Sequence, residues 1–525
     1  MEEGCCNNLC HSSGSDVDGG DQASANDFSP FIHRFATSQS KYVYDVNTRR
    51  IIRVSEPVWD ILPDCGCLEP SRIVAKHAPA YDEAQILSAI EQIEIAQKER
   101  GLFLSQRPEA ISPPSREHVQ QQLEQERQQL LLNVTENCNL RCSYCVFGGT
   151  YEHFRKHSEA QMTWEVAHLA IDDFLAHAKL SESPVISFYG GEPLLNIELI
   201  RQAVAYVKQG HPDTNVGFGM TTNGMLLHGP TAQFLAENSF VITISLDGPR
   251  ETHDRCRRDA GGKPVWDRLI ANIRRFLEEH PVYKSNGRLR FSAVATAATD
   301  LEKIGEFWAS CDICTDSMGM EISAQLDGDS SAARSGQNQD ALSQSRGRVF
   351  GQLVQELESG EWSSRFRSKS RWVHNALSRA FVLFHKRKFL SPHLPNHMGL
   401  ANTCIPGVRR TFVDVQGKYF TCERVITAPE QRIGDVWNGI DLERVMTLLK
   451  TWNQANSAQC RYCWCLSHCM AGCFASLTDG QVTEAAKARL CTAFRRSRRR
   501  MLQQYTAILE ENPAAFDYTS EIEVM

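Results

Sequence analysis

The chain is 525 residues long, with 56 basic and 63 acidic side chains and a formal net charge of −7. At roughly 150 residues per domain, this length predicts three to four domains. The mild acidity argues against a general nucleic-acid-binding protein. The apolar runs fall far short of the ~18 residues that a transmembrane helix needs, and the acidic, polar start MEEGCCNNLC lacks the features of a secretory signal. We therefore expect a cytoplasmic protein.

Cysteine is the residue type that departs most from an ordinary composition, with 19 copies. In a long chain without an export signal, clustered cysteines indicate metal binding rather than disulfides. Ten of them fall into two groups whose spacing is typical of metal ligands.

The first 27 residues are rich in Ser, Asp, Gly and Asn and show no periodicity, which predicts a disordered segment. This segment carries Cys5, Cys6 and Cys10. They are interpreted as incidental exposed thiols, with metal binding as the alternative.

Residues 28–105 are expected to form a small independent module with a winged-helix-like fold. Tyr42–Val46 and Ile51–Val54 are short apolar runs separated by a turn sequence, which predicts a hairpin. Ser55 is placed to cap a helix that follows. Glu83–Lys98 has the apolar spacing of an amphipathic helix.

Residues 106–127 are Pro-rich and then Gln-rich, and are expected to be a linker. From 128 to 325, apolar runs alternate with helical stretches, which predicts an α/β domain with parallel strands. The expected strands are 130–135, 185–189, 216–222, 240–246, 289–296 and 318–325. Six such units predict a partial (β/α)6 barrel of the TIM type.

The remainder of the chain divides into three parts. Residues 326–399 are expected to be a connector, with a loop over 327–348 and helices over 349–390. Residues 400–492 form a Cys-rich domain with few periodic segments. A basic helix is expected over 486–503, and residues 493–525 hold its end and a tail.

The first cysteine group is Cys138, Cys142 and Cys145, which directly follows the first barrel strand. Three thiolates on one loop can ligate three irons of a [4Fe–4S] cube and leave the fourth iron open to an amine and a carboxylate. The alternative is a structural zinc ion with His153 as the fourth ligand.

Active sites of barrels lie at the carboxyl ends of the strands. Polar or glycine-rich segments follow the later strands at 190–193, 221–224, 245–248 and 295–296. Gly190 and Gly191 allow close backbone approach to a ligand, and Glu192 offers a carboxylate to an ammonium group. Asp247 is interpreted as a turn cap, with ligand binding as the alternative.

The motifs CNLRCSYC, FYGGEP, TTNG and SLDGP together resemble those of the radical S-adenosylmethionine (SAM) enzymes, over about residues 130–325. The resemblance implies that SAM chelates the open iron and that one electron cleaves it to methionine and a 5′-deoxyadenosyl radical. That radical abstracts a substrate hydrogen, while the protein orients the reactants and excludes water.

The same resemblance implies a set of SAM contacts. Gly191 and Glu192 would hold the methionyl group, and Tyr144 would pack beside the adenine. Ser245 and Arg257 would contact the methionyl carboxylate or the ribose, although Arg257 can also be interpreted as a surface salt-bridge residue. The full expected set is Tyr144, Gly190, Gly191, Glu192, Asn223, Ser245 and Arg257.

The second cysteine group has seven members, which is too many for one zinc ion and one short of two four-cysteine clusters. They are Cys404, Cys422, Cys460, Cys463, Cys469, Cys473 and Cys491. Their spacing resembles the SPASM extension of radical SAM peptide maturases. The resemblance assigns Cys404, Cys422 and Cys473 to a first auxiliary [4Fe–4S] cluster and the other four to a second.

The first auxiliary cluster lacks the additional nearby cysteine that sulfatase-maturing members have. Its fourth iron is therefore expected to be open, or to be closed by His397 or Cys465. An open iron would bind a substrate thiolate, which fits thioether formation. Glu423 stands where those members have an Asp base, so it is a candidate catalytic base, with a solvated loop carboxylate as the alternative.

The other cysteines are interpreted more simply. Cys65, Cys67 and Cys256 are expected to be core or incidental residues, and the pair Cys311 and Cys314 is a possible site without partners.

The segment KYVYDVNTRRIIRVSEPVWDIL resembles the peptide-recognition element that precedes many maturases of ribosomally made peptides. Such an element binds a leader peptide as an added strand on its hairpin edge. A DNA-binding winged helix is the alternative. The basic run 495–500 would contact an acidic leader or simply form a solvated face.

The sequence thus predicts a radical SAM, SPASM-containing peptide maturase that crosslinks a precursor peptide, with a thioether as the product. Expected cofactors are SAM, one [4Fe–4S] cluster at the SAM site and two auxiliary [4Fe–4S] clusters. Expected partners are the precursor peptide and a flavodoxin or ferredoxin as electron donor, with no nucleic acid and no membrane. Alternative products are a carbon–carbon cyclophane, formylglycine in a sulfatase, or a quinohemoprotein-type crosslink. A zinc-bound peptide scaffold and an iron–sulfur regulator of DNA stay open as other classes.

Overall fold

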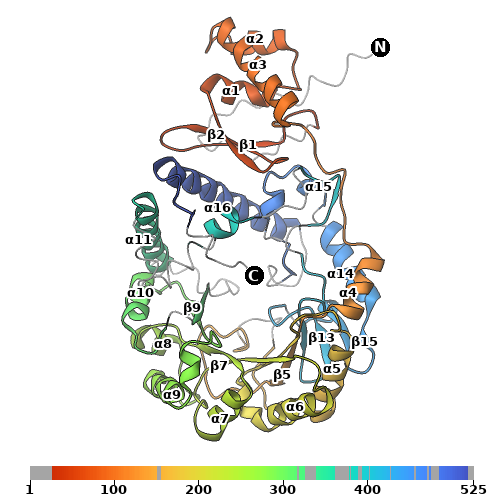
Figure 1. The fold of residues 1–525 in the computed structure, drawn as a ribbon, viewed down its shortest axis with the longest axis vertical. Coiled ribbons are helices and arrows are strands. Elements are labelled where there is room, and N and C mark those ends of the chain that lie inside the picture. Colours follow the sequence, from red (N-terminus) through yellow and green to blue (C-terminus); the bar gives the residue numbers. More distant parts are fainter. Residues whose placement is uncertain are drawn as a thin grey trace.

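The computed structural model describes most of the chain. The described residues are 27–149, 155–315, 318–324, 339–360, 378, 380–387, 393–400, 403–425, 427–454, 457–469, 472–474 and 484–517. Figure 1 shows an N-terminal unit at one end, an open barrel at the other, and the long helix α16 (Glu484–Glu511) between them. The predicted disordered segment with Cys5, Cys6 and Cys10 lies almost entirely outside the described residues.

The N-terminal unit is a three-stranded antiparallel sheet, in the order β1-β2-β3, followed by helices. The predicted hairpin is confirmed, with Tyr44 paired to Ile51, and β1 is a third strand that the sequence did not indicate. The elements are β1 (Ile32–Ala36), β2 (Lys41–Asp45), β3 (Arg50–Val54), α1 (Glu56–Ile61), α2 (Pro70–His77) and α3 (Glu83–Arg100).

The helix ends of this unit follow local sequence rules. Ser55 is at the N-cap of α1 as expected, although its side chain makes no capping hydrogen bond. Asp82 and Gln85 form a capping box at the start of α3, and Gly101 ends that helix in the left-handed conformation at φ 60°.

The N-terminal unit is not independent, so that expectation was wrong. One face of its sheet shares a buried apolar core with the C-terminal part of the chain, to which α16 contributes Leu502. His33 on β1 stacks on Trp464 with ring centroids 3.7 Å apart. The core joins Phe31, Phe35, Tyr42, Tyr44 and Val46 to Trp464, Met501, Leu502, Tyr505, Ile508 and Phe516.

The predicted linker over 106–127 is also wrong, because it contains regular structure. Strand β4 (Ala110–Ile111) pairs with β11 (His397–Met398), and helix α4 (Arg116–Gln125) is capped by the Ser115 hydroxyl. Val119 and Leu123 are spaced one helical turn apart and are buried, which supplies the packing that the Gln-rich composition concealed.

The barrel has the six predicted parallel strands in the order β10-β9-β8-β7-β6-β5. Its strands are β5 (Gln129–Thr135), β6 (Val185–Gly190), β7 (Gly217–Thr222), β8 (Val241–Ser245), β9 (Leu289–Ala295) and β10 (Gly319–Ala324). The helices around them are α5 (Trp164–Ala176), α6 (Ile197–Gly210), α7 (Gly229–Glu237), α8 (Arg250–Cys256), α9 (Trp266–Glu279) and α10 (Leu301–Ser310).

The two faces of the barrel sheet differ in chemistry. Residues in register on one face, such as Leu132, Phe188 and Ile242, are buried and apolar. Alternate residues on the other face are small or polar, as at Ser187 and Ser245. An open barrel with such a face leaves room for ligands at its concave side.

The C-terminal part continues the barrel sheet, which the sequence did not indicate. Strand β12 (Thr411–Val413) pairs parallel to β5 and is followed by β13 (Lys418–Phe420), β14 (Arg432–Asp435) and β15 (Gly439–Ile440), which gives a ten-stranded sheet. Two further helices are α14 (Leu442–Gln454) and α15 (Ser457–Cys460).

The loop predicted over 327–348 is wrong in its second half. Helix α11 (Gln339–Glu358) begins there and buries Val349, Leu353 and Leu357 at helical spacing. The predicted terminal basic helix is confirmed as α16, which extends beyond it at both ends.

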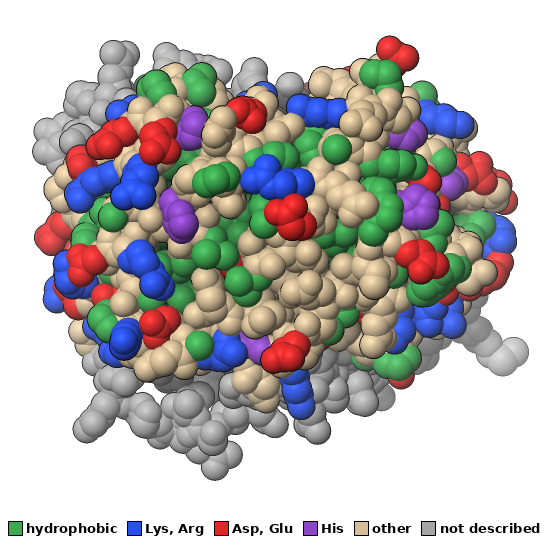
Figure 2. All heavy atoms as spheres, turned by 90° about the horizontal axis from the view of Figure 1, so that it is seen from below, with side chains coloured by type: hydrophobic (Ala, Val, Ile, Leu, Met, Phe, Trp, Pro, Cys, Tyr) green, Lys and Arg blue, Asp and Glu red, His purple; other side chains and the backbone are tan. Residues whose placement is uncertain are grey.

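The barrel face shown in Figure 2 carries Lys, Arg, Asp and Glu side chains interspersed, without an area of a single sign. Within the described residues, no helix is both long and apolar enough to span a membrane.

The shared core yields a prediction. Leu502→Ala removes a fully buried side chain of α16, and we expect a loss of about 3 kcal/mol in unfolding free energy. Amide hydrogen exchange should then accelerate in β1 and β2 but not in β7, whereas Arg500→Ala on the exposed side of α16 should change neither. Unchanged exchange in β1 and β2 would contradict a shared core.

Candidate functional site

The loop with Cys138, Cys142 and Cys145 lies at the carboxyl end of β5, as predicted, and a second segment pairs with it. Arg141 N donates to the Arg258 carbonyl at 2.8 Å, and Ser143 N donates to the Cys256 carbonyl at 2.9 Å. The segment after α8 therefore fixes the loop conformation.

The three thiols are close enough to influence one another, and each is shielded from water. Burial raises the pKa of Cys138 to about 12 and that of Cys142 to about 11, and it also raises the pKa of Cys145. Thiolates here require a strong local positive charge, which ligation to iron supplies. The donor set therefore fits a [4Fe–4S] cluster.

The structure gives little support to a single zinc ion. His153 lies outside the described residues, while His157 Nε2 is 3.7 Å from Cys145 Sγ. Among the described residues, no three His, Cys, Asp or Glu side chains converge on a point where one metal ion could sit.

Gly190 and Gly191 are required by the packing of β6 against the cysteine loop. A Cβ atom at Gly190 would lie 2.3 Å from the Thr135 carbonyl oxygen, and one at Gly191 would lie 2.2 Å from the Asn137 carbonyl oxygen. Gly191 N donates to the Thr135 carbonyl at 2.9 Å. The backbone of Gly190 and Gly191 therefore lies close to the end of β5 and the start of the cysteine loop, and this contact holds the loop against the end of β6.

Glu192 is fully buried, and its carboxylate accepts hydrogen bonds from other residues of the protein. Thr222 Oγ1 and Asn223 N donate to it at 2.7 Å, and Leu194 N donates at 3.1 Å. Burial outweighs these hydrogen bonds and raises its pKa to about 7. The side chain joins the ends of β6 and β7, so a direct contact between its carboxylate and an ammonium group stays a prediction that this geometry does not favour.

Asn223 links the end of β7 to the cysteine loop. Its Nδ2 donates to Asn139 Oδ1 at 2.7 Å and lies 3.9 Å from Cys138 Sγ. This predicted site residue therefore lies beside the expected cluster.

Asp247 organises the other side of the loop. The Tyr144 hydroxyl donates to its carboxylate at 2.5 Å, Arg257 Nε donates at 2.9 Å, and Val294 N donates at 3.0 Å. Burial acts against the charge of Asp247, but the neighbouring Arg257 guanidinium lowers its pKa below the usual value.

Arg257 is buried in this network, so the alternative of a surface salt bridge is wrong. Its guanidinium lies 5.3 Å from the Tyr144 ring centroid and near Cys142. Ser245 ends β8 close in sequence to Asp247, partly exposed. The structure thus groups Tyr144 and Arg257 around one carboxylate, while their contacts with SAM stay predictions.

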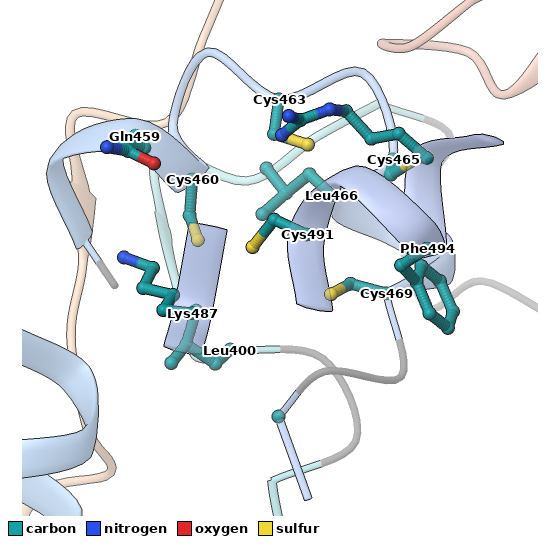
Figure 3. A pocket seen from close by; sticks show the side chains of 12 residues that line it. Leu400, Gln459, Cys460, Cys463, Cys465, Leu466, Cys469, Lys487, Cys491 and Phe494 are labelled. Atoms are coloured by element: carbon teal, nitrogen blue, oxygen red, sulfur yellow. The ribbon is translucent and has the colours of Figure 1, made fainter. Parts of the chain in front are cut away.

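The second auxiliary set comes together in one cavity. Figure 3 shows the sulfurs of Cys460, Cys469 and Cys491 turned toward a common space, between the end of α15 and the start of α16, and Cys463 lines the same cavity. Burial raises the pKa of Cys460 to about 12, and the nearby Lys487 ammonium opposes this effect.

Cys465 belongs to this cavity and not to the first auxiliary set. It lies within hydrogen-bonding reach of Cys463, whose pKa falls to about 6 mainly for that reason. His397 is directed at Glu109, with its Nε2 3.8 Å from a carboxylate oxygen. Among the described residues, neither Cys465 nor His397 makes a hydrogen bond or charge interaction with the first set.

The first auxiliary set is brought together in part. Burial raises the pKa of Cys422 to about 11, and the charges of Glu423 and Cys473 add to this effect, so Cys422 and Cys473 are neighbours. Nothing in the described part of the chain links Cys404 to either of them, and its membership stays a prediction.

Glu423 is not a solvated loop carboxylate, so that alternative was wrong. Its side chain is 12% exposed, and Arg410 Nη1 donates to its Oε1 at 2.6 Å. Its other oxygen is buried, with no hydrogen-bond partner among the described residues. The carboxylate is fixed beside Cys422, where a proton acceptor is expected.

Two other cysteines of the described residues are buried among apolar side chains. Cys65 is buried in the N-terminal core, and Cys311 lies within hydrogen-bonding reach of Cys314 at the end of α10.

Sequence reasoning missed Arg155, which lies between the cysteine loop, β6 and β12. Its guanidinium is 4.3 Å from the Phe147 ring and 4.1 Å from the Phe412 ring, and its Nη2 donates to the Glu423 carbonyl at 3.3 Å. No motif marks it, because its partners come from segments far apart in sequence.

Comparison with known proteins agrees with this geometry. Residues 132–287 match the family model described as the radical SAM superfamily. The chain is 31% identical over 147 residues to a cysteine-type anaerobic sulfatase-maturating enzyme of Clostridium novyi, which covers 28% of this chain and 39% of that enzyme. It is 27% identical over 146 residues to a serine-type anaerobic sulfatase-maturating enzyme of Bacteroides thetaiotaomicron, covering 28% of this chain and 35% of that enzyme. The matched region thus spans well under half of each relative.

A solved structure of native anSMEcpe with bound AdoMet and a Kp18Cys peptide has a similar fold. The TM-score is 0.53 at 17% identity, and the match covers 75% of this chain and 100% of that one. The chain therefore has the radical SAM α/β fold, and its barrel matches the radical SAM superfamily over residues 132–287.

Proposed function

We propose that this protein is a radical SAM peptide maturase that abstracts a hydrogen atom from a ribosomally made precursor peptide and installs a thioether crosslink. The observation that carries the proposal is the joining of three parts in one body. These are the three-cysteine loop at the end of β5, the C-terminal cysteines, and a small β-sheet packed against α16. Among the C-terminal cysteines, Cys422 follows β13 on an extension of the barrel sheet, and four others line a cavity beside α15 and α16.

When bound at its cluster, SAM supplies on one-electron reduction a 5′-deoxyadenosyl radical that abstracts hydrogen. The chain's own residues orient the reactants. Asp247 holds Tyr144 and Arg257 beside Cys142, and Glu192 fixes the turn after β7. Glu423 is held beside Cys422 by Arg410, where it would accept a proton from the substrate.

The N-terminal sheet supports a peptide substrate. Strand β3 has only β2 as a neighbour in the described sheet, while Ala36 of β1 accepts a hydrogen bond from Gln503 of α16. A leader peptide would add to the edge of β3 as a further strand. Arg50 and Arg53 are exposed on β3 and favour an acidic leader.

The C-terminal cysteines would hold two auxiliary [4Fe–4S] clusters, which would accept the electron released when the substrate carbon radical and a cysteine sulfur form the C–S bond. A flavodoxin or ferredoxin would supply the electron that cleaves SAM. The cavity with Cys460, Cys463, Cys469 and Cys491 supports the second cluster. The neighbouring Lys487 and Arg495 offset the negative charge that four thiolates bring.

Formylglycine formation in a sulfatase is the second candidate. The names of the two curated relatives favour it, and so does the burial of Glu423 beside Cys422. Incubation with a cysteine-containing sulfatase peptide separates the two products, because formylglycine replaces the thiol by an aldehyde and forms no crosslink.

The proposal predicts SAM cleavage that depends on Cys142. Anaerobically reconstituted protein with SAM and dithionite should release 5′-deoxyadenosine, measured by mass spectrometry, and Cys142→Ala should abolish it because the cluster loses a ligand. Cys67→Ala, which changes a partly exposed cysteine of the N-terminal unit, serves as the matched control. Wild-type protein with full iron content and no 5′-deoxyadenosine would refute the proposal.

A second prediction concerns Asp247. Asp247→Asn leaves the buried Arg257 guanidinium without its counter-charge, which costs about 3–5 kcal/mol of unfolding free energy, and it should weaken SAM binding because Tyr144 and Arg257 lose their orientation. Asp267→Asn disrupts an exposed pair with Arg250 and should cost less than about 1 kcal/mol. Denaturant unfolding measures the change in unfolding free energy, and SAM titration measures the change in affinity. Equal losses of unfolding free energy in the two variants would contradict the proposal that Asp247 is the counter-charge of Arg257.

A further inference from the structure

Arg155 has an unusual setting for a cationic side chain. The rings of Phe147, Phe412 and Tyr189 lie around its guanidinium, with centroids 4.3, 4.1 and 5.8 Å from Cζ. Burial lowers its pKa from the usual value. Aromatic rings stabilise the faces of a guanidinium and leave its N–H edges for hydrogen bonds.

One N–H edge of the Arg155 guanidinium makes no hydrogen bond among the described residues. Arg155 Nη2 donates to the Glu423 carbonyl, whereas Nη1 is buried and has no hydrogen-bond partner among the described residues. Asn133 Nδ2, on β5, is likewise buried and without a partner in that part of the chain. Unused buried donors are costly, which indicates an acceptor that arrives from outside.

Both side chains line the same cavity, at the ends of β5 and β6. The cavity is also lined by Gly190, Gly191, Phe147, the exposed Lys156 and Glu136, whose carboxylate accepts a hydrogen bond from the Ser158 hydroxyl. It therefore presents an amide donor, a guanidinium and an ammonium group, with one carboxylate at its wall. A planar acidic group fits this set of donors.

The carboxylates of Glu423, Glu136 and Asp414 lie near Arg155 and favour its charged form, but the first two make their short hydrogen bonds to other residues. Glu423 Oε1 accepts from Arg410 at 2.6 Å, and Glu136 Oε2 accepts from the Ser158 hydroxyl at 2.6 Å. Neither carboxylate forms an ion pair with Arg155 among the described residues. A buried guanidinium without a carboxylate partner favours the binding of an anion.

We propose that Arg155 and Asn133 form a subsite that binds an aspartate or glutamate side chain of the substrate peptide, close to the residue that is modified. This inference rests on the proposed function and adds a sequence requirement to it. The subsite would place the peptide between the cysteine loop and Glu423, because Arg155 contacts Phe147 on one side and the Glu423 carbonyl on the other.

The carboxylate of SAM is the other acidic group that such a cavity would accept. Gly190 and Gly191, which belong to the expected SAM set, line this cavity. Ser245 and Arg257, the residues expected to contact the SAM carboxylate or the ribose, lie at and after β8, which is separated from β5 by β7 and β6 in the sheet. Arg155 lies on the opposite side, over the junction of β5 and β12. We therefore assign the subsite to the peptide, and the test distinguishes the two sources.

The test uses full-length, anaerobically reconstituted protein saturated with SAM and without reductant, so that no turnover occurs. The probes are acetyl-Gly-Gly-Glu-Gly-Gly-amide and the same peptide with Gln in place of Glu. We expect the Glu probe to bind the wild type at least about tenfold more tightly, as a charge-assisted bidentate pair would give. Isothermal titration measures both affinities.

Substitutions test which residues make the protein bind the Glu probe more tightly than the Gln probe. Arg155→Gln should abolish it, and Arg155→Lys should retain part of it, because Lys keeps the charge but loses the planar fork. Asn133→Asp should also abolish it, since the new carboxylate would pair with Arg155. Lys179→Gln, which removes an exposed cation that does not line this cavity, should change the preference by less than about twofold.

Two results would overturn the inference. The first is equal binding of the Glu and Gln probes to the wild type. The second is at least a tenfold loss of SAM affinity in Arg155→Gln, which would identify the bound carboxylate as that of SAM. Failure of the proposed function is separate, because it appears as absent 5′-deoxyadenosine with dithionite, a reaction that the probe titration does not involve.

Discussion

The parallel pairing of β12 with β5 is the constraint on which the rest of the structure depends. Phe412 lies opposite Leu131 in this pairing, so the C-terminal segment continues the barrel sheet instead of forming a separate domain. Strand β5 also carries the first cysteine loop at its carboxyl end. Cys422 and Glu423, which follow the next strand, therefore lie near that loop, and Arg155 lies over the junction between them.

The second organising feature is the apolar core shared by the N-terminal sheet and the C-terminal segments. His33 stacks on Trp464, which stands between Cys463 and Cys465, and Tyr44 lies edge-on to the same indole. A peptide bound to the small sheet would thus be held by the same body that carries the second auxiliary cysteine set. The segment that carries Cys463 and Cys465 and the small sheet stabilise each other, because they pack in one apolar core.

Local patterns were sufficient to predict the barrel strands, the hairpin, the helix over Glu83–Lys98 and the three-cysteine loop, since each depends on periodicity or spacing within one segment. Most of the errors involve partners distant in sequence. The linker over 106–127 folds because β4 pairs with β11, and the N-terminal unit is not independent because α16 completes its core. Glu192 was recognised as a functional residue type, but its hydrogen-bond partners Thr222 and Asn223 lie at the end of the next strand and could not be read from spacing. Arg155 carried no signal, because its aromatic neighbours come from three separate segments.

The central claim is that this chain holds one cluster in the barrel and two in the C-terminal part. Iron and sulfide content of anaerobically reconstituted protein tests it most directly, together with the triple variant Cys138→Ala, Cys142→Ala and Cys145→Ala. The account predicts about 12 iron atoms per chain in the wild type and about 8 in the variant, at four iron atoms per cluster. Wild-type protein that binds zinc in place of iron, or a triple variant that keeps the full wild-type iron content, would contradict it.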